Sequence, residues 1–175
     1  MAAQLVGDKG QEIGIDMNDA MLTLARKYQA EMAGKQGGDR VRFLKGYIQD
    51  LALDLSAMED YLKEHPMQTA ADLAELKAWQ ATQRRIRPLI PDRSVDLVIS
   101  NCVLNLVDDN DKQQLVHEIY RVLKPGGRIA IADIVSNEPI PAHLKTDPKL
   151  WAVAFPGHFR SRNFWKYWLR QASLP

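Results

Sequence analysis

Short apolar runs alternate along the chain with longer segments in which apolar residues recur at helical spacing. The first run, EIGID at residues 12–16, predicts a buried strand that ends at an acid. Residues 21–28 follow with a helical pattern, and Gly34, Gly37 and Gly38 predict its end. A second run at residues 41–44 predicts another strand. This order of strand, helix and strand is typical of a parallel sheet covered by helices.

The second half of the chain repeats this order after a long helical segment. Residues 51–87 are rich in Leu, Ala, Glu and Lys with one break at a His-Pro pair, so they predict two helices that form an insertion. Residues 95–100 predict a buried central strand, and residues 113–123 predict an amphipathic helix that ends at Lys-Pro-Gly-Gly. Residues 128–135 predict the next buried strand. The pattern as a whole predicts an α/β fold.

Composition narrows the function classes. The 175 residues carry 23 Lys and Arg against 22 Asp and Glu, which gives none of the basic excess typical of nucleic-acid binders. A single Cys excludes a disulfide framework. No apolar run is long enough to span a bilayer, and the N-terminus lacks the features of a signal peptide. We therefore expect a cytoplasmic protein without nucleic-acid or membrane partners.

Candidate ligand-binding residues follow the predicted strands, because open parallel sheets bind ligands beyond the carboxyl ends of their strands. Asp16 ends the first strand, where a carboxylate can accept hydrogen bonds from both ribose hydroxyls of a nucleotide-type cofactor; the alternative is a helix N-cap. Met17 either packs on an adenine face or fills the core. The glycine-rich loop that usually precedes such an acid is absent from the sequence. We therefore expect a sheet without its first strand.

Four segments resemble class I S-adenosylmethionine (SAM) dependent methyltransferases: IGIDMNDAMLTLAR, VRFLKGYIQDL, SVDLVISNCVLNLV and EIYRVLKPGGRIAIADIVS. The chain is most similar to the arsenite methyltransferases, because SNCVLNL is much more specific to that branch than the other motifs are. The insertion at residues 51–87 resembles the arsenosugar-type members. The resemblance covers residues 2–152 and implies a partial methyltransferase domain over residues 1–152. Its Rossmann-like sheet would be incomplete, without the first strand and the C-terminal strands.

The resemblance also implies a SAM cofactor and the residues that bind it. Asp16 would bind the ribose hydroxyls, and Met17 would lie against adenine. Ile48 and Gln49 would edge the adenine pocket, and Asn101 would line the pocket near the methionine part.

Cys102 would be one of the thiolates that hold the substrate, trivalent arsenic, taken up as such or as a thiol conjugate. As(III) is a soft centre that exchanges oxygen for sulfur ligands, and its lone pair then attacks the SAM methyl group. The alternative for a lone Cys is a small buried hydrophobe.

No metal site is predicted. The four histidines are scattered and none has a second ligand at metal spacing. Asp108, Asp109 and Asp111 precede a helix, where the helix dipole favours acids. Asp133, at the end of its strand, is expected only to cap a turn.

The last part of the chain, residues 153–175, holds four basic residues, no acid and six of the thirteen aromatics. A membrane-surface or partner-binding helix is one interpretation. The family, however, carries a second arsenic-binding Cys in a segment like LWxGCISGAF. Synonymous codons exist for residues 153–173 that, with one G restored ahead of them, translate as GCISGAFQEQEFLEVLAQASF. We therefore expect a single-base deletion after Ala152 and an out-of-frame tail, which the codons of the gene would test.

The sequence thus predicts a fragment of an enzyme that transfers a methyl group from SAM to As(III). We expect this fragment to bind SAM weakly or not at all and to be inactive. One alternative is a methyltransferase of another small molecule, in which Cys102 is structural; another is a non-catalytic Rossmann-like remnant. An NAD enzyme is disfavoured because the dinucleotide fingerprint is absent.

Overall fold

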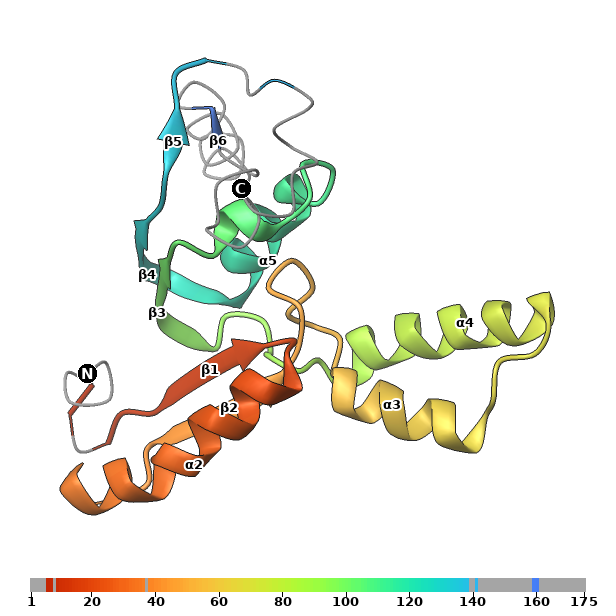
Figure 1. The fold of residues 1–175 in the computed structure, drawn as a ribbon, viewed down its shortest axis with the longest axis horizontal. Helices are drawn as coiled ribbons and strands as arrows, with labels where there is room; N and C mark the ends of the chain where they lie inside the picture. Colours follow the sequence, from red (N-terminus) through yellow and green to blue (C-terminus); the bar gives the residue numbers. More distant parts are fainter. Residues whose placement is uncertain (1–5, 8, 37, 139–140, 142–158, 161–175) are drawn as a thin grey trace. The chain divides into compact units, whose positions relative to one another are not determined.

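The structure, a computed structural model, describes residues 6–7, 9–36, 38–138, 141 and 159–160. The chain divides into two compact units, residues 1–89 and residues 90–175. The described elements of the first unit are β1 (Glu12–Asp16), α2 (Asp19–Gln36), β2 (Val41–Lys45), α3 (Leu55–Glu64) and α4 (Ala70–Ile86) (Figure 1). Those of the second unit are β3 (Val95–Asn101), the short helix η1 (Leu104–Leu106), α5 (Lys112–Val122), β4 (Leu123–Ala132), β5 (Val135–Ser136) and β6 (Phe159–Arg160).

In the first unit, β1 and β2 form a parallel pair whose register ends with Asp16 opposite Lys45. Side chains of α2 donate hydrogen bonds to backbone carbonyls of β2 and so hold the helix against the strand. The Arg26 guanidinium donates to the Phe43 carbonyl at 2.9 Å, and the Gln29 amide donates to the Val41 carbonyl at 2.7 Å. The predicted strand, helix and strand are therefore confirmed, and α2 ends at Gln36, between the glycines that predict its end.

The helical segment at residues 51–87 consists of two helices with a break at His65, as its sequence predicts. Asp54 caps α3 by accepting from the next backbone N–H groups, and Thr69 and Asp72 form a capping box at the start of α4. The Tyr61 ring of α3 stacks on the Trp79 ring of α4, with their centroids 4.6 Å apart. The two helices therefore lie side by side, as Figure 1 shows in yellow and lime green.

In the second unit, β3 and β4 form a parallel pair. The buried side of α5 supplies half of the eight buried apolar residues described in this unit, namely Leu115, Val116, Ile119 and Val122, each at most 3% exposed. Helix α5 ends at Val122, just before the Lys-Pro-Gly-Gly segment, as its sequence predicts, and that segment lies within β4. Leu123 already pairs with Val95, and a register shift before Leu97 absorbs the extra residues.

The prediction that residues 95–100 and 128–135 form buried strands is wrong in its burial. Leu97 and Ile99 of β3 are 42% and 57% exposed, and exposed and half-buried residues alternate along β4. The physical reason is that successive side chains of a strand point to opposite faces of the sheet, and the alternating burial indicates that only one face is covered by the described residues. The α/β class with parallel pairing is nevertheless confirmed.

Most of the expected out-of-frame tail lies outside the described residues. Within residues 153–175 the structure describes Phe159–Arg160, which pair in parallel with Val135–Ser136.

Candidate functional site

Asp16 stands at the carboxyl end of β1 and is half-buried. Its Oδ1 accepts a hydrogen bond from the backbone N–H of Asn18 at 2.8 Å. The N-cap of α2 is Asn18, whose side-chain oxygen accepts from Ala20 and Met21 at 2.9 and 3.3 Å, so the alternative role of Asp16 as the helix cap is wrong. Among the described residues, nothing donates to Oδ2 of Asp16, which leaves that oxygen able to accept from a ligand hydroxyl.

The turn that carries Ile48 and Gln49 begins beside Asp16. The backbone N–H of Gly46 donates to the Asp16 carbonyl at 3.0 Å. A Cβ on Gly46 would lie 2.6 Å from a methyl group of Leu89, so a larger residue at this position would require the Leu89 side chain to move. Ile48 and Gln49 are both half-buried. The structure therefore brings the turn and Asp16 together at one end of the β1–β2 pair.

Met17 follows Asp16 and is 61% exposed, so it does not fill the core of the first unit. An exposed thioether beside a half-buried carboxylate and the Ile48 turn presents both apolar and polar surface. This combination suits a nucleoside, whose base is apolar on its faces and whose ribose donates hydrogen bonds.

Lys45, at the end of β2, is a buried cation that sequence reasoning missed. It is 8% exposed, and its ammonium group forms ion pairs with Asp19 of α2 at 2.6 Å and with Glu59 of α3. The hydrogen bond to Asp19, followed by the one to Glu59, raises the pKa of Lys45 above its ordinary value. Lys45 therefore ties α2 and α3 to the end of the strand that leads into the Gly46 turn.

In the second unit, Asn101 ends β3 and Cys102 follows it with a φ of 54°, in the left-handed region that non-glycine residues rarely adopt. The Cys102 thiol is free and exposed, so the alternative of a buried hydrophobe does not hold. The backbone N–H of Cys102 donates to the Ala132 carbonyl at 2.8 Å. This bond fixes the loop against the end of β4 while the side chain remains accessible.

Asp133 does more than cap a turn. Its carboxylate accepts from the backbone N–H of Leu104 at 3.0 Å and from the side-chain amide of Asn105. Asn105 is fully buried and also donates to the Ile134 carbonyl at 3.0 Å. Sequence reasoning missed Asn105, although the second Asn of SNCVLNL was visible. These bonds hold η1, and with it the Cys102 loop, to the end of β4.

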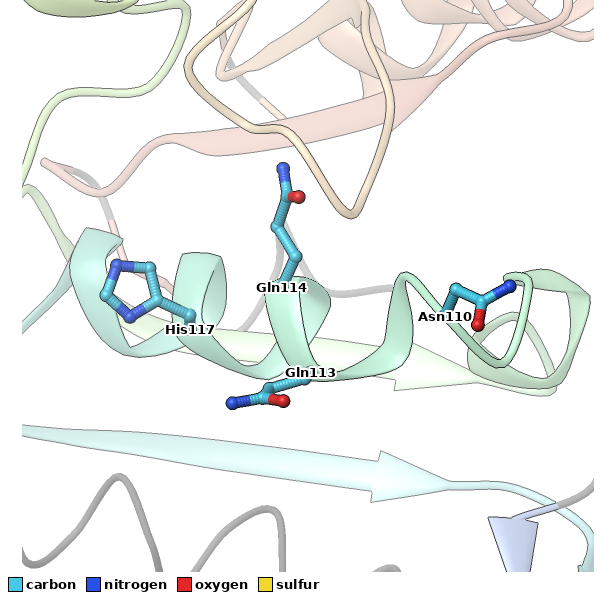
Figure 2. Close-up of a pocket in the computed structure, with 4 residues that line it drawn as sticks. All are labelled: Asn110, Gln113, Gln114 and His117. Carbon is cyan, nitrogen blue, oxygen red and sulfur yellow. The ribbon is translucent and has the colours of Figure 1, made fainter.

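A shallow polar surface on α5 is lined by Asn110, Gln113, Gln114 and His117 (Figure 2). Gln113 and Gln114 point to opposite sides of the helix in this view. This surface contains none of the predicted site residues. In the part of the chain that the structure describes, no group of three or more His, Cys, Asp or Glu side chains could hold a metal ion. None of the helices described has the length and apolar character needed to cross a membrane.

A protein-family model described as "Methyltransferase domain" matches residues 62–173. The chain belongs to this family. The methyltransferase domain is similar to the arsenite methyltransferase of Mus musculus, with 32% identity over 166 residues that cover 94% of this chain and 34% of the relative. It is also similar to the arsenite methyltransferase of Halobacterium salinarum, with 33% identity over 148 residues that cover 85% of this chain and 27% of the relative.

Among solved structures, the methyltransferase domain is similar to CrArsM, an arsenic (III) S-adenosylmethionine methyltransferase from Chlamydomonas reinhardtii. The TM-score is 0.67 at 29% sequence identity, and the match covers 98% of this chain and 46% of that chain. The predicted resemblance to arsenite methyltransferases and the predicted Rossmann-like class of fold are confirmed. The methyltransferase domain spans about a third of the length of the curated relatives that it matches.

Proposed function

We propose that this methyltransferase domain is part of an enzyme that transfers a methyl group from SAM to trivalent arsenic, with Cys102 as one of the thiolates that bind the arsenic. The observation that carries the proposal is the exposed Cys102 thiol, directly after Asn101 at the carboxyl end of β3. Ligands of open parallel sheets bind at that end of the strands. Similarity to arsenite methyltransferases supports arsenic as the substrate.

The residues at the end of β1 and β2 fit the adenosine part of SAM. Oδ2 of Asp16 accepts no hydrogen bond from the described residues, so it would accept one from a ribose hydroxyl. Met17 and Ile48 would contact the faces of adenine, and the Gln49 amide can exchange hydrogen bonds with its edge. In the second unit, Asn101 would contact the methionine part of SAM.

When bound, SAM supplies a methyl group on a positively charged sulfur. Cys102 would hold the arsenic as a thiolate ligand, because its S–H and an As–OH group can exchange to give an As–S bond and water. This ligation would leave the arsenic lone pair free to take up the methyl group that SAM would supply. The role of this chain is to hold the arsenic, orient its lone pair and bind the adenosine.

Calorimetric titration of SAM into the chain tests the cofactor half of the proposal. We expect weak binding that Asp16→Ala lowers by about tenfold or more, because hydrogen bonds to a charged group are worth about 1.5–3 kcal/mol. Asp60→Ala is the matched control, since Asp60 is exposed on α3 and pairs only with Lys63 among the described residues. The same loss in both variants, or no binding by the unaltered chain, would contradict this half.

Protection of the thiol tests the arsenic half. We expect arsenite to slow the reaction of Cys102 with 5,5′-dithiobis(2-nitrobenzoate), because arsenic and the reagent compete for the same thiolate. Cys102→Ser gives the background, since Cys102 is the only Cys in the chain. SAM binding without any effect of arsenite would favour a methyltransferase of another small molecule.

A further inference from the structure

Two ion pairs flank the turn that carries Ile48 and Gln49. Lys45 precedes the turn and pairs with Glu59 of α3, while Asp50 closes the turn and pairs with Arg84 of α4. Lys45 and Asp50 are both 8% exposed, so the turn begins and ends at a buried charge. Each of these charges finds its partner on one of the two helices of the 51–87 segment.

The pair between Asp50 and Arg84 has the geometry of a fixed contact. The Arg84 Nε donates to the two carboxylate oxygens at 3.2 and 3.0 Å, and its Nη2 donates to one of them at 2.8 Å. An arginine that donates from two nitrogens fixes both the distance and the orientation of a carboxylate. The side chain of Asp50 is 11% exposed, so solvent screens this contact less than it screens a surface pair.

Asp50 also determines the path of the turn. Its backbone N–H donates to the Tyr47 carbonyl at 3.1 Å, which closes the loop around Ile48 and Gln49. Its own carbonyl accepts from Leu53 at 3.3 Å, at the start of the buried run that leads into α3. A shift of Asp50 would therefore move the two residues between it and Tyr47.

The helices can serve as a rigid support because they are fastened to each other. Besides the stacking of Tyr61 on Trp79, the Gln80 amide of α4 contacts the Met58 sulfur of α3 at 3.1 Å. After α4, the backbone N–H of Leu89 donates to the Ala52 carbonyl at 3.0 Å, which joins the two ends of the segment.

We propose that the α3–α4 hairpin positions the Ile48–Gln49 turn through Glu59 and Arg84, and thereby sets the affinity of the chain for the adenosine part of SAM. This inference rests on the proposed function for its ligand. Arg84 and Glu59 are positioning residues, because they act through Asp50 and Lys45.

Hydrogen–deuterium exchange on the full chain, with and without Arg84→Ala, tests the positioning directly. We expect faster exchange of the amides of residues 47–50 in the variant, while the amides of β1 keep their rates. Arg85→Ala is the matched control, because Arg85 is exposed on the same helix and makes no hydrogen bond with the described residues. A folded Arg84→Ala variant whose turn exchanges like the unaltered chain would overturn the proposal. If Arg84→Ala does not fold, Arg84→Lys, which keeps the charge but not the two-nitrogen contact, decides by the same measurement.

Titration of SAM into the same variants provides the second readout. We expect Arg84→Ala to weaken binding about tenfold and Arg85→Ala to leave it unchanged. Unchanged SAM affinity together with faster exchange would overturn the link to the cofactor. If the unaltered chain binds no SAM, the proposed function fails, and the exchange rates alone decide whether the hairpin holds the turn.

Discussion

The backbone N–H of Cys102 donates to the carbonyl of Ala132 at 2.8 Å, which joins the end of β3 to the end of β4. This bond holds Cys102 at a φ of 54°, a conformation that costs about 1–2 kcal/mol for a residue with a Cβ. The loop is therefore kept in a strained conformation at the position where the proposed substrate binds. Such strain is frequent at functional sites.

The strained backbone at Cys102 predicts that a glycine variant is more stable than an alanine variant at this position, the reverse of the usual order. We expect Cys102→Gly to be more stable than Cys102→Ala by about 1 kcal/mol, because glycine adopts a positive φ without steric cost. Urea denaturation measures the difference. At Val103, whose φ is −115°, the order should reverse, since glycine there adds only unfolded-state entropy. The same order at both positions would contradict the prediction.

The hydrogen-bond network around Asp133 predicts that a substitution of this residue lowers the stability of the fold. We expect Asp133→Asn to lower the free energy of unfolding by about 1–3 kcal/mol, because an amide nitrogen would then face the donors of Leu104 or Asn105. Asp108→Asn is the control, since Asp108 is exposed and, among the described residues, accepts hydrogen bonds only within its own turn; its effect should stay within about 0.5 kcal/mol. Equal effects of the two substitutions on the urea midpoint would show that the network is not stabilising.

The core of the second unit depends on α5. Leu115 is 0% exposed, so we expect Leu115→Ala to lower the free energy of unfolding by about 2–5 kcal/mol through lost burial and the cavity that remains. Leu73→Ala, at a position 44% exposed on α4, should change it by about 0.5 kcal/mol or less. Circular dichroism during urea denaturation measures both variants. A small effect at Leu115 would mean that α5 does not pack as described.

The capping box of α4 predicts a pH-dependent contribution from Asp72. Hydrogen bonds from the backbone N–H groups of Gln68 and then Thr69 lower the pKa of Asp72 below its ordinary value of 3.8. A carboxyl group whose pKa is lower in the folded state stabilises the fold above its unfolded pKa, and this contribution is lost as the pH falls through the folded pKa.

We therefore expect Asp72→Asn to be less stable than the unaltered chain near neutral pH. The difference should narrow as the pH falls below 3.8. Thermal unfolding of both proteins across this range measures the difference. A gap that is independent of pH would mean that the Asp72 charge does not contribute to the capping box.

Hydrophobic runs, prolines and glycines in the sequence predicted the strands and helices whose bounds depend on neighbouring residues. The strand Glu12–Asp16 agrees residue for residue, and the break at His65 follows from the proline after it. The end of α5 was predicted to within one residue, but the start of β4 at Leu123 was not, because the pairing of Leu123 with Val95 depends on a distant strand. Propensity at one position carries no information on such a partner.

In the candidate site, too, local features could be predicted from the sequence and long-range contacts could not. Asp16 and Cys102 were predicted as site residues from their positions after apolar runs and from the family motif, and these roles stay predictions. The groups that hold their surroundings were missed, because Asn105 and Asp133 stand 28 residues apart and Asp50 and Arg84 stand 34 apart. Such pairs follow no helical or strand period, so only the folded chain shows that they meet.

Because Asn18 caps α2, the start of that helix does not depend on Asp16. The cap of α2 and the proposed ribose contact are therefore assigned to separate side chains two positions apart. A chain with Asp16→Ala can serve as a folded reference that lacks the proposed ribose contact. Its signal in a binding titration can be subtracted from that of the unaltered chain. Asn18→Ala provides the converse reference, in which the helix is weakened while the carboxylate is kept.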